Sequence, residues 1–229
     1  MKKFDQLPAR LQNDAVRAYY DILAHKRCSL FFKRFFDLAV AVCVGIVMLL
    51  PMLVIGVVIK CTSAGPVFYR QVRVGRYGQE FRIFKFRTMV QNADQIGGQI
   101  TVGDRDPRIT GVGYFLRKTR LDEFPQVLNI LCGQMCLIGA RPEVPKYVQQ
   151  YTDEMLATLL LAPGISGEAS LRFKNENELL AASNDPEQCY IQQVLPEKMR
   201  INLEYLLKLS VWYDIKLLVQ TFIVIFKHH

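Results

Sequence analysis

The longest apolar run in the chain covers residues 38–59, LAVAVCVGIVMLLPMLVIGVVI, and contains no charged residue. A helix of this length reaches across about 30 Å of hydrocarbon, the thickness of a bilayer core. The alternative is a buried helix of a soluble protein, but such helices usually keep a polar face and this run has none. The pattern therefore predicts a helix that enters a membrane.

The flanking charges and an internal proline predict how this helix meets the membrane. Lys33 and Arg34 precede the run, and seven Lys and Arg residues face a single acid over residues 60–87. The positive-inside rule places both flanks on the cytoplasmic face. Pro51 removes one backbone donor and favours a kink, although Leu50 offers no side-chain bond to the freed carbonyl. We therefore expect a re-entrant helix–break–helix hairpin that enters one leaflet and returns.

Outside this run, the hydrophobic pattern predicts short elements joined by turns. Residues 67–89 alternate apolar and basic side chains around two glycines, which is typical of a β-hairpin. Residues 91–111 are polar and rich in Gly and Asp, so they predict a loop. Helices are expected over 9–30, 112–119, 126–132, 146–160, 185–204 and 205–227, with turn-rich loops at 137–145 and 162–167.

Together these elements predict an α+β fold. We expect a monotopic membrane protein with a re-entrant membrane helix hairpin, a small β-hairpin and several short or amphipathic interfacial helices. An amphipathic N-terminal helix would occupy residues 1–30, and the membrane helix, broken at Pro51, would occupy 31–60. A cytosolic or interfacial catalytic domain would cover 61–229. Its C-terminal helix ends in an apolar stretch, 217–226, that is too short to span and is therefore expected to be interfacial.

Composition narrows the choice of partner. The chain has 229 residues, of which 51% are hydrophobic and 22% charged, and its formal net charge is +8. A basic, apolar chain suits an anionic membrane face, phosphorylated small molecules or nucleic acid. Nucleic acid is disfavoured because the basic residues adjoin the apolar run instead of forming a separate patch.

Cysteine and histidine usage limits the chemistry. The six cysteines have no metal-ligand spacing and predict reduced, mostly buried thiols of a protein that faces the cytosol. Only three histidines occur, and two of them end the chain, so a histidine-based triad or zinc site is disfavoured. Catalysis would therefore rest on carboxylates, arginines, lysines or a bound metal.

The segment LRKTRLDEFPQVLN places two carboxylates side by side, Asp122 and Glu123, just behind three cations. Pro125 suits the first turn of a helix, so the acids would lie at its N-terminus, where the helix dipole favours negative charge. Arg117 and Arg120 would further hold both acids ionised. Such a pair offers oxygen ligands of the kind that Mg²⁺ prefers. An ordinary helix start with an N-cap acid and surface salt bridges is the alternative.

Three longer motifs surround this pair: KFRTM at 85–89, GDRDPRITGVGYFLRKTRLDEFPQVLNILCGQM at 103–135 and IGARPEVP at 138–145. In this combination, and with the apolar run directly upstream, the chain resembles the bacterial sugar transferases over roughly residues 30–215. These are monotopic phosphoglycosyl transferases that start glycan assembly on a polyprenol phosphate.

The chain departs from the family pattern at three positions. Members usually carry DELPQ, GPRP and a serine before the central proline, where this chain has Phe124, Ala140 and Leu50. Phe124 is a mild change, Ala140 loosens its loop while keeping Arg141, and Leu50 affects the detail of the kink.

The resemblance implies a reaction and a place in the cell. The substrates would be a nucleoside diphosphate sugar, usually a UDP-sugar, and a polyprenyl phosphate such as undecaprenyl phosphate. The product would be the polyprenyl-diphosphate sugar, with UMP released, in the first membrane step of glycoconjugate assembly. The enzyme would lie among the lipids of the bacterial inner membrane with its catalytic domain on the cytoplasmic face. Nucleic acid is not an expected partner, and a homodimer is left open.

The resemblance also implies residue roles. Asp122 would attack the β-phosphorus and form an aspartyl phosphosugar, and Glu123, with Asp122, would hold Mg²⁺ on the diphosphate. Arg117 and Arg141 would offer planar forks to phosphate oxygens. Asp214 is expected to pack or pair helices. Further residues expected to line the cleft are Lys85, Arg87, Asp104, Arg105 and Arg108.

Two rival functions use the same residues. A membrane-tethered, metal-dependent phosphodiesterase would hydrolyse the diphosphate without a lipid acceptor. A non-catalytic membrane scaffold would tolerate the loss of Asp122.

Overall fold

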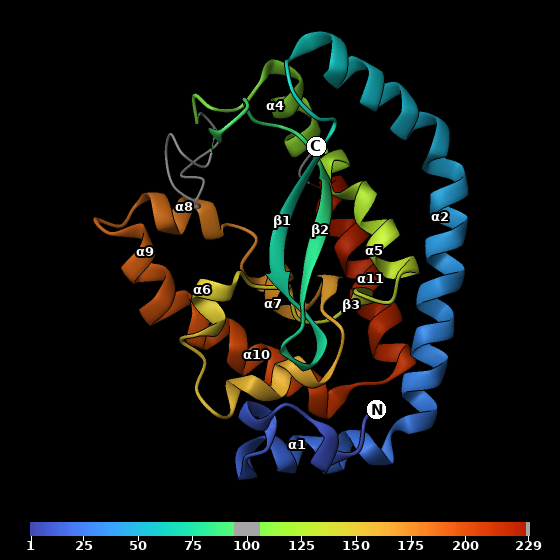
Figure 1. Cartoon of the computed structure of the whole chain (residues 1–229), viewed down its shortest axis with the longest axis vertical. Coiled ribbons are helices and arrows are strands. Elements are labelled where there is room, and N and C mark those ends of the chain that lie inside the picture. Colours follow the sequence, from blue (N-terminus) through green and yellow to red (C-terminus); the bar gives the residue numbers. More distant parts are fainter. Residues whose placement is uncertain (94–105, 228–229) are drawn as a thin grey trace.

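The computed structural model describes residues 1–93 and 106–227, so Asp104, Arg105 and most of the loop expected at 91–111 lie outside the described residues. Figure 1 shows a β-hairpin in the middle of the molecule. One long helix, α2 (Arg27–Thr62), follows one edge, and short helices cover the opposite side. The mixed helix and small-sheet architecture confirms the α+β prediction.

The helix α2 passes through Pro51 without interruption, so the expected break into two helices is wrong. A proline inside a helix removes one backbone hydrogen bond and bends the helix axis. The residues on both sides of Pro51 remain helical. Figure 1 shows the resulting curvature of α2 toward its C-terminal end.

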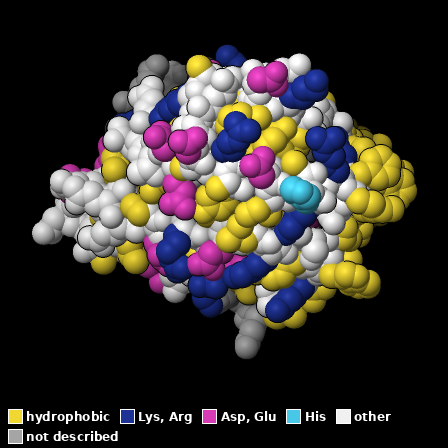
Figure 2. Space-filling view, turned by 90° about the horizontal axis from the view of Figure 1, so that it is seen from below, with side chains coloured by type: hydrophobic (Ala, Val, Ile, Leu, Met, Phe, Trp, Pro, Cys, Tyr) yellow, Lys and Arg dark blue, Asp and Glu magenta, His cyan; other side chains and the backbone are white. Residues whose placement is uncertain are grey.

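The apolar part of α2 is not covered by the protein. The helix is long and apolar enough to cross a membrane, and only 6% of its most apolar 18-residue window is buried. Ile46, Val47 and Leu50 expose 70–72% of their surface. In Figure 2, hydrophobic side chains gather at the edge of the molecule on which α2 lies. An exposed apolar surface of this kind is suited to contact with lipid.

Both ends of α2 contact the same body of the protein. Near its start, Lys33 is buried, and Arg34 donates hydrogen bonds to carbonyl oxygens at the end of α5 (Val127–Leu131) and just beyond. Near its end, Ile59 is buried with Phe86 and Leu116. The two basic residues that the sequence placed at a membrane surface therefore bond within the protein.

The predicted β-hairpin is confirmed. Strand β1 (Phe68–Val74) pairs antiparallel with β2 (Glu80–Phe86), with Val74 opposite Glu80 at the turn end. The turn contains η3 (Arg76–Gly78), where both Tyr77 and Gly78 have positive φ. Every second residue of the first half of β2 is buried, which fits the alternating pattern of its sequence.

A second, two-stranded sheet was not predicted. Strand β3 (Cys136–Ile138) pairs parallel with β4 (Gly164–Ser166), where the sequence suggested only turn-rich loops. The backbones of the two segments approach so closely that a Cβ on Gly164 would lie 2.2 Å from the backbone nitrogen of Gly139. The glycines that suggested loops therefore permit this pairing.

Two expected helices differ from the observed ones. The helix expected over 146–160 is replaced by the short α6 (Pro145–Val148) and the 3₁₀ helix η5 (Met155–Leu160). The N-terminal helix is shorter than predicted, because Asn13 caps α1 (Asp14–His25) and the chain after Lys26 already belongs to α2.

The remaining elements include helices that the sequence predicted and three short ones, at 4–6, 168–172 and 176–181, that it did not. They are η1 (Phe4–Gln6), η2 (Ala9–Leu11), α4 (Gly111–Lys118), η4 (Leu121–Gln126), α7 (Glu168–Arg172), α8 (Glu176–Ala181), α9 (Pro186–Cys189), a π-helix η6 (Tyr190–Val194), α10 (Leu195–Lys208) and α11 (Val211–Lys227). The main core lies between α1, η5 and α10 and includes Leu23, Leu156, Leu160 and Met199. The six cysteines are free, but only Cys136 is buried, so the expectation of mostly buried thiols is wrong.

The close approach of α4 to the chain at Thr88 gives a test of this packing. A Cβ on Gly113 would lie 2.0 Å from the carbonyl oxygen of Thr88, whereas one on Gly111 would meet nothing within 4 Å. We expect Gly113→Ala to lower the free energy of unfolding by about 2 kcal/mol or more, because the backbone must move. Gly111→Ala should change it by less than about 0.5 kcal/mol. Denaturant unfolding of both variants in detergent makes the comparison, and equal effects would contradict the contact.

Candidate active site

The two adjacent carboxylates lie in a short 3₁₀ helix between α4 and α5. Arg120 precedes this helix, η4, in the left-handed region (φ 58°), and Asp122 and Glu123 occupy its first turn. Pro125 lies inside η4, so the acids do not cap α5, which begins only at Val127. The sequence correctly predicted a helix start at the acids but assigned them to the wrong helix.

Glu123 is the centre of an ion-pair cluster. Lys85, from β2, places its Nζ 2.8 Å from Oε1 of Glu123. Arg141, three residues after β3, bonds the same carboxylate through both of its terminal nitrogens, with Nη1 at 3.4 Å from Oε2. Three separate segments of the chain therefore meet at one carboxylate.

The pKa values of the two acids are shifted in opposite directions. Burial alone would raise the pKa of Glu123, but the charges and hydrogen bonds of Arg141 and Lys85 lower it well below the usual range. Burial and the negative charge of Glu123 raise the pKa of Asp122, against the weaker pull of Lys85, Arg120 and Arg117. Arg117 and Arg120 act on Asp122 in the expected direction, but burial and the charge of Glu123 outweigh them, so the pKa of Asp122 is raised and not lowered.

Asp122 keeps one oxygen unbonded. Among residues 1–93 and 106–227, Oδ1 of Asp122 has no hydrogen-bond partner, although the atom is buried. The side-chain amide of Gln126, four residues later, is also buried and unpartnered within the same residues. Such orphaned polar atoms cost free energy unless a water, ion or ligand meets them. The site is therefore suited to a polar guest.

The donor set fits Mg²⁺ only together with a phosphorylated ligand. In the part of the chain that the structure describes, no group of three or more His, Cys, Asp or Glu residues could hold a metal. Asp122 has a free oxygen, whereas the oxygens of Glu123 already accept from Lys85 and Arg141. Mg²⁺ commonly takes one or two carboxylates and completes its shell with phosphate and water.

The other cations expected in the cleft have distinct positions. Arg117 lies half-buried in the last turn of α4, and its charge acts on Asp122. Arg87 is buried and donates from Nη2 to the backbone and hydroxyl oxygens of Ser63, 2.8 Å from each, at the end of α2. Arg108 forms an ion pair of 2.6 Å with Asp106. The structure thus brings Lys85 and Arg141 onto Glu123 and gives Arg87 and Arg108 bonds elsewhere.

Sequence reasoning missed a buried network behind Arg141. Glu143 accepts from Tyr190, at 2.6 Å, and from Lys198, at 3.3 Å, and all three are buried. Arg73, from β1, donates to the carbonyl oxygen of Pro142 at 3.0 Å. In the sequence, Glu143 is visible as the acid of the motif ARPEVP, but its partners lie 47 and 55 residues away and could not be identified from it. The network fixes the segment that presents Arg141.

The chain matches known proteins over most of its length. A family model described as bacterial sugar transferase matches residues 28–228. The UDP-glucose:undecaprenyl-phosphate glucose-1-phosphate transferase of Escherichia coli is 34% identical over 200 residues, 85% of this chain and 39% of that protein. The UDP-N-acetylgalactosamine-undecaprenyl-phosphate N-acetylgalactosaminephosphotransferase of Aeromonas hydrophila is 38% identical over 195 residues, 83% of this chain and 43% of that protein.

These relatives are longer than the chain, which spans about two fifths of each. A shorter relative from Bacillus subtilis is 36% identical over 152 residues, which is 64% of this chain and 80% of that protein.

The different surroundings of the two acids predict opposite effects of removing each charge. Glu123→Gln leaves Lys85 and Arg141 without their counter-charge and should lower the free energy of unfolding by about 3 kcal/mol at neutral pH. Asp122→Asn removes a desolvated charge beside a like charge, so stability should stay unchanged or rise. Thermal unfolding in detergent compares both variants with the wild type, and a larger loss in Asp122→Asn would contradict the assignment.

The pH dependence follows from the direction of each pKa shift. The folded pKa of Glu123 is lowered, so its stabilisation is present above the unfolded value of about 4.3 and is lost as pH falls toward the folded value. The folded pKa of Asp122 is raised, so the wild type loses stability relative to Asp122→Asn as pH rises through that value. The difference in free energy of unfolding between each variant and the wild type should therefore become smaller at acidic pH.

Proposed function

The chain belongs to the bacterial sugar transferase family, and we propose that it transfers a sugar 1-phosphate from a UDP-sugar to undecaprenyl phosphate, with release of UMP. The names of its relatives in Escherichia coli and Aeromonas hydrophila describe reactions of this type. The observation that carries the proposal is the contrast between Glu123, held by two cations, and Asp122, one oxygen of which has no partner among residues 1–93 and 106–227.

Asp122 is the nucleophile in this proposal. Its free oxygen attacks the β-phosphorus of the UDP-sugar, and the bond from that phosphorus to the bridging oxygen breaks, so UMP leaves with the electron pair. An oxygen of undecaprenyl phosphate then attacks the same phosphorus and releases the Asp122 carboxylate. An unbonded carboxylate oxygen in a desolvated site is a better nucleophile than one held by cations, which favours Asp122 over Glu123.

The cations balance the charge of the diphosphate. Arg141 presents a planar fork and Lys85 a point charge beside the attacked phosphorus, and Arg117 adds a second fork from α4. Asp122 and Glu123 would hold Mg²⁺, which when bound neutralises charge on the phosphate oxygens. Glu123 would also keep Lys85 and Arg141 in place before the donor binds.

We further propose that α2 is re-entrant, with both ends on the cytoplasmic face of the inner membrane. Arg34 near its start and Ile59 near its end contact one body of the protein. A helix crossing the bilayer would separate those contacts by about 30 Å of hydrocarbon. It would also draw charged parts of the body into lipid, at a cost of about 3 kcal/mol or more per charge. Figure 1 shows α2 bending toward its C-terminal end, which supports this proposal.

The covalent step can be tested directly. Incubation of the wild type with UDP-glucose, UDP-galactose or UDP-N-acetylgalactosamine, without lipid, should add a phosphosugar to the peptide that contains Asp122, detected by mass spectrometry. Asp122→Asn should form no adduct and lose turnover with undecaprenyl phosphate by at least about a thousandfold, while its thermal unfolding stays cooperative.

Three outcomes would count against the proposal. Substantial turnover by Asp122→Asn would remove the nucleophile. Multiple turnovers of UMP release without a lipid acceptor would indicate a phosphodiesterase. No reaction of the wild type with any of the three donors, with Mg²⁺ and lipid present, would contradict the transferase assignment.

The topology can be tested by labelling single cysteines in a background without native cysteines. Ala9→Cys and Asn184→Cys both introduce a thiol at an exposed position, one before α2 and one after it. We expect an impermeant thiol reagent to label neither in intact cells and both after permeabilisation. Labelling of Ala9→Cys alone in intact cells would mean that α2 crosses the membrane, whereas the transfer reaction would not be affected.

A further inference from the structure

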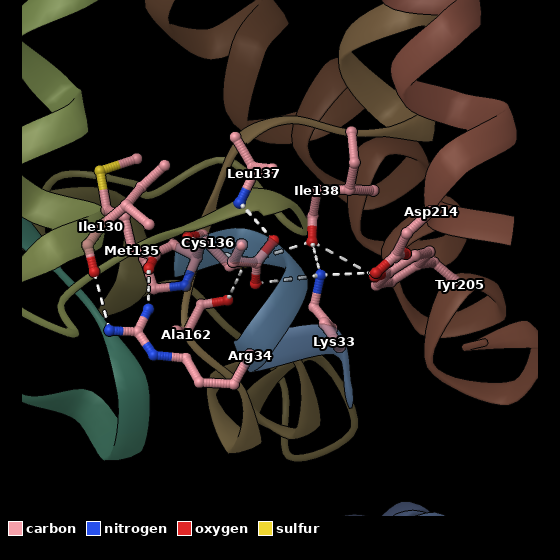
Figure 3. Close-up of polar contacts among 12 residues, drawn as sticks. Lys33, Arg34, Ile130, Met135, Cys136, Leu137, Ile138, Ala162, Tyr205 and Asp214 are labelled. Atoms are coloured by element: carbon pink, nitrogen blue, oxygen red, sulfur yellow. Dashed lines mark hydrogen bonds and ion pairs between the residues drawn. The ribbon is translucent and has the colours of Figure 1, made fainter. Parts of the chain in front are cut away.

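A buried ionic cluster lies at the base of α2, away from the two acids. It consists of Lys33, Asp37, Tyr205 and Asp214, which we call the anchor cluster, and all four side chains are buried. Lys33 Nζ lies 2.6 Å from Asp214 Oδ2 and 3.8 Å from Asp37 Oδ2. The Tyr205 hydroxyl lies 2.6 Å from the other oxygen of Asp214. Figure 3 shows Lys33, Tyr205 and Asp214 pointing toward one another.

The anchor cluster holds the main chain of β3. The carbonyl oxygen of Ile138 accepts from Lys33 at 2.7 Å, and the Tyr205 hydroxyl, whose single hydrogen is shared with Asp214, lies 3.2 Å from the same oxygen. The backbone nitrogen of Leu137 donates to Asp37 at 3.2 Å. Two consecutive residues of this short strand are therefore fixed by side chains, in addition to the pairing with β4.

A stiff three-residue segment leads from β3 to the ion-pair cluster. Gly139 donates to Ser166 at 2.9 Å, and Ala140 accepts from Gly164 at 2.8 Å, so the chain stays paired after the strand ends. Arg141 then donates to the carbonyl oxygen of Ile165 at 3.1 Å and bonds Glu123. The space around Gly139 and Gly164 is filled by backbone, so a shift of Ile138 would move Arg141 as well.

The same turn of α2 also holds the element that carries the acids. Arg34, next to Lys33, donates to the carbonyl oxygens of Ile130 at 2.8 Å and Met135 at 3.4 Å (Figure 3). Ile130 belongs to α5, which continues directly from the helix of Asp122 and Glu123. One turn of α2 therefore contacts both β3, which leads to Arg141, and α5, which follows the helix of Glu123.

We propose that the anchor cluster positions Arg141 against Glu123, so that the base of the membrane helix sets the geometry of the active site. Lys33, Tyr205 and Asp214 are then positioning residues, which act on the reaction through Arg141 and touch no substrate. The role in turnover rests on the proposed function, whereas the mechanical link to β3 does not.

The link can be tested without any substrate. Tyr205→Phe removes one hydroxyl from the anchor cluster and changes no charge. Tyr213→Phe is the matched control, because its hydroxyl lies 2.6 Å from Glu168 and does not reach β3. Hydrogen–deuterium exchange of the peptide covering residues 136–141 should be faster in Tyr205→Phe and unchanged in Tyr213→Phe. Unchanged exchange in Tyr205→Phe would overturn the proposal, whether or not the protein is active.

The catalytic consequence can be tested by a double-mutant cycle. Tyr205→Phe should lower kcat/KM for the UDP-sugar by about three- to tenfold, the effect of one hydrogen bond. In an Arg141→Lys background the same change should cost less than about twofold, because both act on one contact. Tyr213→Phe should leave KM unchanged in both backgrounds. Asp214→Asn, which keeps the volume but takes the carboxylate from Lys33, should act as Tyr205→Phe does and more strongly.

A merely structural role would give a different result. Tyr205→Phe would then lower the active fraction, and hence the apparent kcat, and leave KM for the UDP-sugar unchanged. Its fold-loss in kcat/KM would be the same in the wild-type and Arg141→Lys backgrounds. That outcome would overturn the positioning role. A wild type without transferase activity would contradict the proposed function, and the exchange experiment would still decide the mechanical link.

Discussion

The ion pairs of Glu123 with Lys85 and Arg141 are the interaction on which the candidate active site depends. Burying a single carboxylate without a counter-charge is costly, and two carboxylates in adjacent positions cost more. Two cations on Glu123 relieve that cost for one acid only. Asp122 is left desolvated, with one oxygen that has no partner among the described residues, so the two adjacent acids differ in their surroundings.

These ion pairs require that three separate elements of the fold keep fixed positions. Lys85 comes from β2, Glu123 from η4 and Arg141 from the segment after β3, so three elements must keep a fixed spacing. The β-hairpin, the short parallel sheet and the base of α2 supply it. The helix that offers an apolar face to lipid thus also packs, at its polar base, against the carriers of the reactive groups.

Features of the fold that depend on local pattern could be predicted from the sequence. The apolar run of α2 and the alternation in β1 and β2 are visible without knowledge of any contact. The pairing of β3 with β4 was not predictable in this way, because each strand has three residues and they are far apart in the chain. Glycines at 139 and 164 suggested loops, although here they allow two backbones to touch.

The sequence named candidate residues of the site but could not predict the electrostatics among them. Family motifs identified Asp122, Glu123, Lys85 and Arg141, but which acid takes the cations depends on packing. Lys33 was interpreted as a membrane flank because its partner, Asp214, lies 181 residues away. Charges that are buried through such distant contacts look like surface charges in a sequence.

The most direct test of the unequal acids is a pH titration of their side-chain carboxyl carbons by ¹³C NMR, in protein labelled at Asp and Glu. Spectra of Asp122→Asn and Glu123→Gln would assign the two signals. The Glu123 signal should stay at its ionised position to the lowest pH at which the protein is folded, and the Asp122 signal should titrate above the ordinary aspartate range. Titration of both carboxyls near pH 4, the ordinary value for such groups, would contradict the division of roles.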